Sequence, residues 1–245
     1  EKYAENVKIA CKTPRIAVIK EVVESISDAD VKAAFAKTVE GLKSKGFVVE
    51  NVSVSKAILE SLLPTYFVIS CAEATSNNAN LDGIKFGDRQ PGDTYEDVIT
   101  NTRTNGFSEL IKRRFIIGSY SLLRDNREDL FNRAQKCRRL IVDAINKVFE
   151  KYDAIYVPAS PSTAPLLKGG SSDKLSDEYL IADNCLAIGN FGGFPSLTLP
   201  IGFENDLPFG ANLTCKPFAE STLFNIANKI EESTGYKNLL VKEGK

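Results

Sequence analysis

The chain has 245 residues, of which 43% are hydrophobic and 26% are charged. These values are typical of a soluble globular protein with a sizeable core. Its net charge of −1 and pI near 5.8 provide no overall basic field for a nucleic-acid backbone. The absence of histidine excludes a Ser-His-Asp triad, Cys-His catalysis and His-dependent metal sites within this sequence. Hydrolysis by these residues would need a carboxylate, a lysine or a Ser-Lys arrangement.

The cysteine pattern favours reduced thiols over a disulfide framework or a zinc site. The number of cysteines is odd, their spacing is wide and no C-x-x-C occurs. Reduced thiols are typical of the cytoplasm, which is therefore the expected location. The five positions are Cys11, Cys71, Cys137, Cys185 and Cys215.

The N-terminus and the lack of methionine indicate a piece of a longer polypeptide. No initiator methionine is present, and the polar N-terminus lacks the apolar core of a signal peptide. No apolar run is expected to approach the roughly 20 residues that a membrane span needs. A fragment is the simplest explanation, and a processed chain would also fit; no contact with a membrane is expected.

The first part of the sequence predicts a strand–helix–strand unit. The β-branched run at 14–19 and the apolar run at 47–52 are typical of buried strands. Between them, the stretch 27–30 has the pattern of a capping box that opens a helix with one apolar stripe. Two strands joined in this way pair in parallel through a right-handed crossover. The stripe consists of Val31, Ala34, Phe35, Val39 and Leu42.

The middle of the sequence is mainly helical. Residues 55–80 have a helical pattern that is interrupted at Pro64, and a polar, glycine-containing stretch follows at 82–93. Helices are predicted over 107–123 and over 125–152. The basic side chains of the second helix are interpreted as a solvated face, with a partner-binding face as the alternative.

The last part of the sequence contains more strands. The predicted elements are a strand over 153–157, a loop over 159–177, a helix over 178–189, paired strands over 196–199 and 211–215, and an amphipathic helix over 221–233. The fold class is therefore α/β, with a mixed β-sheet flanked by helices. Because no internal repeat and no convincing linker is present, we expect residues 1–245 to form a single domain.

Seven short motifs together resemble those of a known family. They are similar, in order and over almost the whole sequence, to motifs of the A subunit of the glutamyl-tRNA(Gln) and aspartyl-tRNA(Asn) amidotransferases, within the amidase-signature family. Each motif alone is weak, but their common order makes the resemblance specific. The motifs are Cys71–Asn77 with Leu81–Gly87, Thr102–Phe107, Lys112–Gly118, Ala134–Arg138, Tyr152–Pro158, Gly193–Pro200 and Leu207–Pro217.

The resemblance implies an amidase-signature fold and a glutaminase that works within a ligase complex. In that family the A subunit releases ammonia from glutamine, and the complex converts Glu-tRNA(Gln) to Gln-tRNA(Gln). The implied partners are the B and C subunits. ATP and Mg²⁺ are expected on the B subunit, so this chain should bind no cofactor and meet tRNA only indirectly, through that partner.

The catalytic residues that the resemblance implies are expected to lie outside this sequence. In the family, the nucleophilic serine, a second serine joined through a cis peptide and the lysine that deprotonates them precede the matched motifs. The chain is thus expected to be the C-terminal portion of an amidase-signature domain, without its Lys/Ser/Ser segment. It should supply walls of the substrate site and be inactive alone.

Recognition of glutamine requires groups for two opposite charges. The planar fork of an arginine suits the α-carboxylate, and an acidic residue suits the ammonium group. The resemblance places substrate binding at Tyr66, Arg114 and Asp183, with Arg113 as the alternative to Arg114. The structural alternatives are, respectively, a half-buried aromatic, a surface charge and a first-turn helix carboxylate. Glu73 is a candidate for lining an ammonia route, or else a buried, paired carboxylate.

Two other functions stay open. The first is another amidase-signature hydrolase of small amides, since a simple apolar amide needs neither Arg114 nor Asp183. The second is a non-catalytic interaction module, because the sequence lacks a complete nucleophile–base pair. The sequence also departs from the family pattern. Phe86 replaces a tyrosine, 184–190 replaces a stretch that usually contains proline, and 123–126 replaces a glycine-containing turn.

Overall fold

The computed structural model describes residues 1–7, 13–26, 28–164, 185–204 and 206–237. These residues form two compact units. Unit 1 contains the described residues of Glu1–Leu62, Leu140–Ser172 and Ser176–Lys245, and unit 2, as far as it is described, is Leu63–Arg139.

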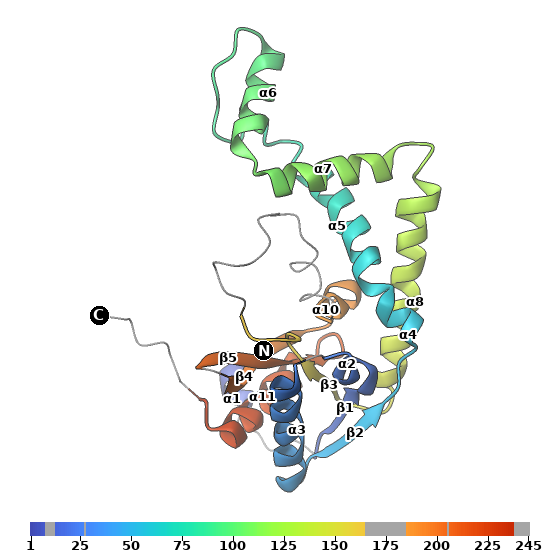
Figure 1. The fold of residues 1–245 in the computed structure, drawn as a ribbon, viewed down its shortest axis with the longest axis vertical. Coiled ribbons are helices and arrows are strands. Elements are labelled where there is room, and N and C mark those ends of the chain that lie inside the picture. The colour runs from blue at the N-terminus through green and yellow to red at the C-terminus, as the bar shows by residue number, and fades with distance from the viewer. Residues whose placement is uncertain (8–12, 27, 165–184, 205, 238–245) are drawn as a thin grey trace, which may run out of the picture. The chain divides into compact units, whose positions relative to one another are not determined.

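A five-stranded mixed sheet forms the centre of unit 1 (Figure 1). Its strand order is β2-β1-β3-β5-β4. Strand β1 pairs in parallel with both β2 and β3, whereas β5 is antiparallel to both β3 and β4. This arrangement confirms the predicted α/β class with a mixed sheet. The strands are β1 (Arg15–Ile19), β2 (Val48–Val52), β3 (Ala154–Pro158), β4 (Ser196–Glu204) and β5 (Leu207–Cys215).

Helix α3 (Ala29–Ser44) lies on the predicted crossover between β1 and β2. Its N-cap is Asp28, whose Oδ1 accepts hydrogen bonds from the backbone N–H groups of Asp30 and Val31 at 3.0 and 3.1 Å. The cap is therefore one residue later than the capping box predicted at 27–30, and residue 27 itself lies outside the described residues. The carboxylate at the N-cap therefore accepts hydrogen bonds from two backbone N–H groups that have no acceptor within the helix.

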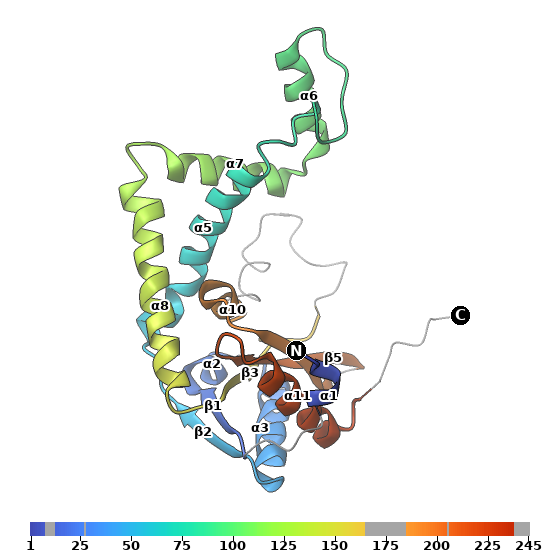
Figure 2. The same ribbon diagram turned by 180° about the vertical axis from the view of Figure 1, so that it is seen from behind.

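The core of unit 1 lies between the sheet and the helices α3 and α11 (Glu220–Thr234). Both helices cover the same face of the sheet (Figures 1 and 2). Phe35 of α3 stacks on Tyr156 of β3, with ring centroids 5.0 Å apart. The hydroxyl group of Tyr156 is buried without a hydrogen-bond partner among the described residues, and this burial raises its pKa.

Four shorter helices belong to the described part of unit 1. They are α1 (Tyr3–Asn6), α2 (Lys20–Glu24), α4 (Lys56–Glu60) and α10 (Ala187–Gly192). Helix α10 begins and ends later than the helix predicted over 178–189, of which residues 178–184 lie outside the described residues. It ends at Gly193, whose φ of 63° is the left-handed conformation that commonly follows a helix.

Unit 2 is mainly helical, and its longest described loop joins α5 to α6. The helices are α5 (Leu62–Asn77), α6 (Tyr95–Gly106), α7 (Glu109–Leu122), the π-helical turn η1 (Glu128–Asn132) and the start of α8 (Arg133–Phe149). The sequence did not predict α6. The single helix predicted over 125–152 instead begins with η1 and continues as α8.

The interruption predicted at Pro64 was wrong in position. Helix α4 ends at Glu60 and α5 begins at Leu62, so the break lies at Ser61. Pro64 lies within the first turn of α5. A proline is tolerated there because its missing N–H would have no acceptor within the helix.

One helical stretch, Lys56–Asn77, is long and apolar enough to cross a membrane by length and composition alone. The expectation that no apolar run approaches this length was therefore wrong. Only 28% of its apolar window is buried. One such helix is weak evidence for a membrane protein, because the core helix of a soluble protein can pass the same test of length and composition.

Candidate functional site

Helices α5 and α7 contact each other closely in unit 2 (Figure 2). Gly118 of α7 lies against α5, where a Cβ atom would overlap the carbonyl group of Cys71 and the hydroxyl group of Thr75. The Thr75 hydroxyl donates to the carbonyl oxygens of Cys71 and Phe115, at 2.9 and 3.2 Å. It thereby links the two helices. Two of the family-like motifs meet at this contact.

Arg114 of α7 is half-buried, and its charge acts on the thiol of Cys71. Burial raises the pKa of this thiol, while Arg114 and a hydrogen bond with Ser70 oppose part of the increase. The Nε atom of Arg114 is buried and has no hydrogen-bond partner among the described residues. A buried guanidinium N–H without an acceptor is unfavourable. An anionic ligand that supplied an acceptor would remove this cost.

The other predicted site residues lie elsewhere on α5 or outside the described residues. Tyr66 and Glu73 share one face of α5, because seven residues make about two helical turns. Cys71, which Arg114 approaches, is rotated by about 140° from Tyr66 around the helix. Tyr66 is half-buried and Glu73 is exposed, whereas Asp183 lies outside the described residues. The substrate pocket and the ammonia route both stay predictions.

Arg103 of α6 holds the loop that follows α5. Its Nη1 donates to the carbonyl oxygens of Asn78 and Leu81, at 2.9 and 3.1 Å. The guanidinium group also lies over the rings of Phe107 and Phe115, 5.0 and 5.2 Å from their centroids. Local sequence patterns offered no physical reason for this role, and the family-like motif that contains Arg103 was its only signal.

A second polar arrangement joins β4 and β5 in unit 1. The Oδ1 atom of Asn212 accepts from the hydroxyl groups of Ser196 and Thr214, each at 2.9 Å, and its Nδ2 donates to Thr198 at 3.1 Å. Asn212 and Thr214 are buried, whereas Ser196 and Thr198 are exposed. Because side chains alternate along a strand, these residues lie on the face opposite the α3–α11 core. The buried amide therefore fixes two exposed hydroxyl groups.

The cysteines that the structure describes are free thiols, namely Cys71, Cys137, Cys185 and Cys215. Cys11 lies outside the described residues, and the reduced state of the five thiols stays a prediction. Within the described ranges, no group of three or more Cys, Asp or Glu side chains is placed to hold a metal ion.

Comparison with known sequences identifies the family. The sequence model described as Amidase matches residues 1–224. The chain belongs to the amidase family. It is similar to the A subunit of glutamyl-tRNA(Gln) amidotransferase from Francisella philomiragia, with 35% identity over 222 residues. That match covers 89% of this chain and 44% of the relative, so the chain spans less than half of the relative's length.

Solved amidase structures share the fold. The crystal structure of the glutamyl-tRNA(Gln) amidotransferase A subunit from Thermotoga maritima matches 91% of this chain and 43% of its own, with a TM-score of 0.67 and 32% identity. A bacterial aryl acylamidase of the amidase-signature family covers 96% of this chain with a TM-score of 0.66, and 46% of its own chain is matched. At 14% identity, this second likeness shows the fold alone. The predicted amidase-signature fold is thereby confirmed.

Proposed function

We propose that this amidase-family chain is part of a glutaminase that serves a tRNA-dependent amidotransferase. The intact enzyme releases ammonia from glutamine in the cytoplasm, for conversion of Glu-tRNA(Gln) to Gln-tRNA(Gln). Support comes from the similarity to two proteins named as A subunits of glutamyl-tRNA(Gln) amidotransferases, at 35% and 32% identity. The serine nucleophile and its lysine base come from a segment outside this chain, so these residues alone do not turn over glutamine.

The proposed complex divides the remaining chemistry between two partner subunits. ATP and Mg²⁺ bind to the B subunit, which also handles the tRNA, and the C subunit is needed to complete the assembly. The chain contributes no cofactor of its own. Its net charge of −1 supports an indirect contact with tRNA, because a phosphate backbone is attracted by a net positive protein surface.

The observation that carries the substrate assignment is the buried, unpartnered Nε atom of Arg114. A guanidinium group presents Nε–H and one Nη–H side by side, which matches the two oxygens of an α-carboxylate. An apolar amide would leave this donor unsatisfied, so an amino-acid amide is the better substrate. In this proposal Asp183 binds the ammonium group, Tyr66 forms part of the wall and Glu73 lines the ammonia route.

Substitution of Arg114 in the intact enzyme, with its serine segment, tests the proposal. Arg114→Ala should raise KM for glutamine about 30- to 150-fold, because loss of a charged hydrogen bond costs about 2–3 kcal/mol. Glutaminamide has no α-carboxylate, so its turnover by wild type and Arg114→Ala should be similar. Steady-state ammonia release with both substrates measures the difference.

The adjacent Arg113→Ala variant is the matched control, because Arg113 is exposed on the same helix. Its KM for glutamine should stay at the wild-type value. A rise in KM for Arg113→Ala alone would transfer the carboxylate role to that residue. An unchanged KM in both variants, with glutaminamide hydrolysed as well as glutamine, would favour a hydrolase of small amides.

A further inference from the structure

One side of α7 packs on α5, and this side carries Arg114. Residues three or four positions apart are neighbours on a helix, so Arg114, Phe115 and Gly118 lie on the same side of α7. At Gly118 a Cβ atom would overlap the carbonyl group of Cys71 and the hydroxyl group of Thr75. These two residues of α5 are themselves four positions apart, so they present one face to α7.

The hydroxyl group of Thr75 makes a hydrogen bond across this contact. Its oxygen lies 2.9 Å from the carbonyl oxygen of Cys71 and 3.2 Å from that of Phe115. A hydroxyl group has one proton to donate, so the two helices share it. The first acceptor is the usual one for a threonine within a helix. The second belongs to the residue that directly follows Arg114, so Thr75 holds the backbone of α7 next to the proposed ligand-binding arginine.

The ring of Phe115 is held by a different helix. The guanidinium group of Arg103 in α6 lies over this ring, 5.2 Å from its centroid, and the ring of Phe107 meets it edge-on at 4.9 Å. Arg103 is itself fixed by its hydrogen bonds to two carbonyl oxygens of the loop after α5. Backbone and ring of Phe115 are therefore held from two directions, which opposes rotation of α7 about its axis.

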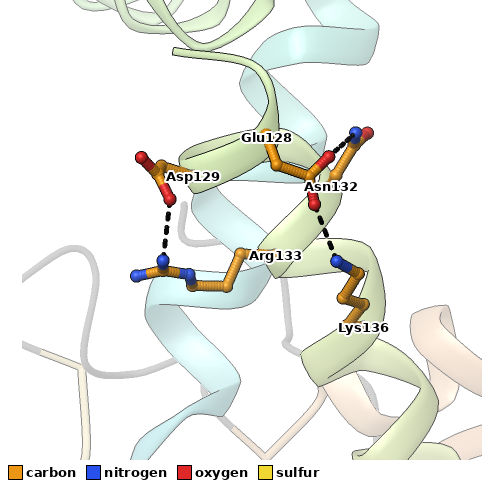
Figure 3. A network of polar contacts seen from close by, with 5 residues as sticks. All are labelled: Glu128, Asp129, Asn132, Arg133 and Lys136. Atoms are coloured by element: carbon orange, nitrogen blue, oxygen red, sulfur yellow. Dashed lines mark hydrogen bonds and ion pairs between the residues drawn. The ribbon is translucent and has the colours of Figure 1, made fainter.

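The far end of α7 is followed by a separate polar network (Figure 3). Glu128 accepts hydrogen bonds from Asn132 and Lys136 at 2.6 and 2.7 Å, and Asp129 pairs with Arg133 at 2.8 Å. All five side chains belong to η1 or α8, and the ion pairs are exposed. Exposed pairs contribute little to stability. The network therefore does not explain how the α5-facing side of α7 is held.

We propose that Thr75 is a positioning residue for recognition of the substrate's α-carboxylate. The inference rests on the proposed function, in which Arg114 binds that carboxylate. The planar fork of an arginine forms two parallel hydrogen bonds with a carboxylate in one orientation, so a small rotation of α7 weakens both. The buried Nε atom of Arg114 has no hydrogen-bond partner among the described residues. Its direction therefore depends on the helix that carries it, and Thr75 holds that helix.

Thr75→Val in the intact enzyme, with its serine segment, tests this role. Valine is close in shape to threonine but has no hydroxyl group, so the substitution removes the hydrogen bond and leaves the volume filled. KM for glutamine should rise about 3- to 10-fold, the scale of one neutral hydrogen bond, with kcat unchanged. Glutaminamide has no α-carboxylate, so its KM should not rise. Steady-state ammonia release measures both substrates.

Thr75→Ser is the conservative variant, because it keeps the hydroxyl group. Its KM for glutamine should return to the wild-type value. A merely structural role of Thr75 predicts a different pattern, in which Thr75→Val impairs glutamine and glutaminamide equally. That pattern, a wild-type KM for glutamine in Thr75→Val, or a KM in Thr75→Ser as high as in Thr75→Val would each overturn the inference.

Two matched controls remove polar groups nearby. Ser76→Ala deletes the hydroxyl group of the next residue of α5, which donates within the same helix to the carbonyl oxygen of Ala72 at 3.3 Å. Lys136→Ala breaks the ion pair with Glu128. Both variants should keep the wild-type KM for glutamine. If either raises KM as much as Thr75→Val does, the effect is a general loosening of these helices and the inference is wrong.

A double variant shows whether Thr75 acts through Arg114. Thr75→Val combined with Arg114→Ala should have the same KM for glutamine as Arg114→Ala alone, because no guanidinium group is left to position. Effects of the two substitutions that multiply would mean that Thr75 acts by another route, against the inference.

The single variants separate the inference from the proposed function. If Arg114→Ala raises KM for glutamine and Thr75→Val does not, the role of Thr75 is wrong and the substrate assignment stands. If Arg114→Ala itself has the wild-type KM, there is no carboxylate contact to position and both fail.

Discussion

Gly118 is required by the close approach of two helices rather than by its own backbone conformation. Its missing Cβ allows the carbonyl group of Cys71 and the hydroxyl group of Thr75 to pack against α7. A glycine within a helical pattern ordinarily lowers helix stability. The compensating contact is made with residues much earlier in the chain, so the pattern around Gly118 could not reveal it.

Gly118→Ala should lower the free energy of unfolding by about 1–3 kcal/mol, because the added methyl group overpacks the contact between α5 and α7. The matched control is Gly41→Ala in α3, where a Cβ would meet nothing within 4 Å. That change should instead raise the free energy of unfolding by about 0.5–1 kcal/mol through helix propensity. Urea unfolding followed by circular dichroism measures both. Equal shifts in the two variants would contradict the close approach.

Arg114 illustrates how far the sequence predicts the site. Its residue type and position in a family-like motif were sufficient to nominate it for an α-carboxylate. The burial of its Nε atom and its proximity to Cys71 depend on how α7 packs on α5. That packing could not be derived from local spacing. The angular position of Tyr66 around the axis of α5 follows from helical periodicity. Periodicity does not predict on which side of α5 the helix α7 packs, so it could not show whether Tyr66 faces Arg114.

At the scale of elements, the best predictions were those with a strong apolar pattern. The stretches now seen as β1 and α11 were recognised, because each buries a continuous or periodic set of apolar side chains. Strand β2 was recognised from its apolar run, although Val49 is the one residue of the strand that is buried. Helix α6 was missed for the opposite reason. Val98 and Thr102 are its only buried residues, so it has almost no apolar stripe. Its signal is instead a capping box formed by Thr94 and Asp97.

The capping box of α6 predicts a local effect of Thr94→Ala. The Thr94 hydroxyl oxygen accepts from the backbone N–H of Asp97 at 3.1 Å, and the Asp97 carboxylate accepts from the backbone N–H of Thr94 at 3.0 Å. Loss of the cap costs about 1 kcal/mol, so amide exchange in α6 should become about fivefold faster. Hydrogen exchange with mass spectrometry can measure this change.

The control for the cap is Thr104→Ala, an exposed position within the same helix. Alanine has the higher helix propensity there, so exchange in α6 should stay the same or become slower. If Thr94→Ala and the wild type exchange at the same rate, the capping box does not stabilise α6.

For the whole molecule, the sequence predicted where the strands lie in the chain more readily than their order in the sheet. The β1–β2 pair follows from one crossover, and the β4–β5 pair follows from two neighbouring apolar runs. The order β2-β1-β3-β5-β4 requires β3 to lie between β1 and β5, which come from distant parts of the chain. Local periodicity contains no information on such pairings. The expectation of a single domain stays a prediction.

The buried thiol of Cys215 links the core of unit 1 to the stability of the protein in alkali. Burial, with a smaller contribution from the charge of Asp153, raises the pKa of this thiol to about 12, against an ordinary value of 9.0. In the unfolded chain the thiol ionises near its ordinary pKa, whereas the folded protein resists ionisation. The stabilisation is therefore complete below about pH 9 and is lost as the pH rises toward 12.

Over that interval the buried thiol should lower the free energy of unfolding by about 1.4 kcal/mol for each pH unit. Cys215→Ala removes the titrating group, so its stability should fall less steeply with pH than that of the wild type. The control Val157→Ala also truncates a buried residue of the sheet and should lose about 1–3 kcal/mol at every pH, but it should keep the wild-type slope. Urea midpoints between about pH 8 and 10.5 give the slopes. The same slope for wild type and Cys215→Ala would show that this thiol is not the source of the alkaline loss.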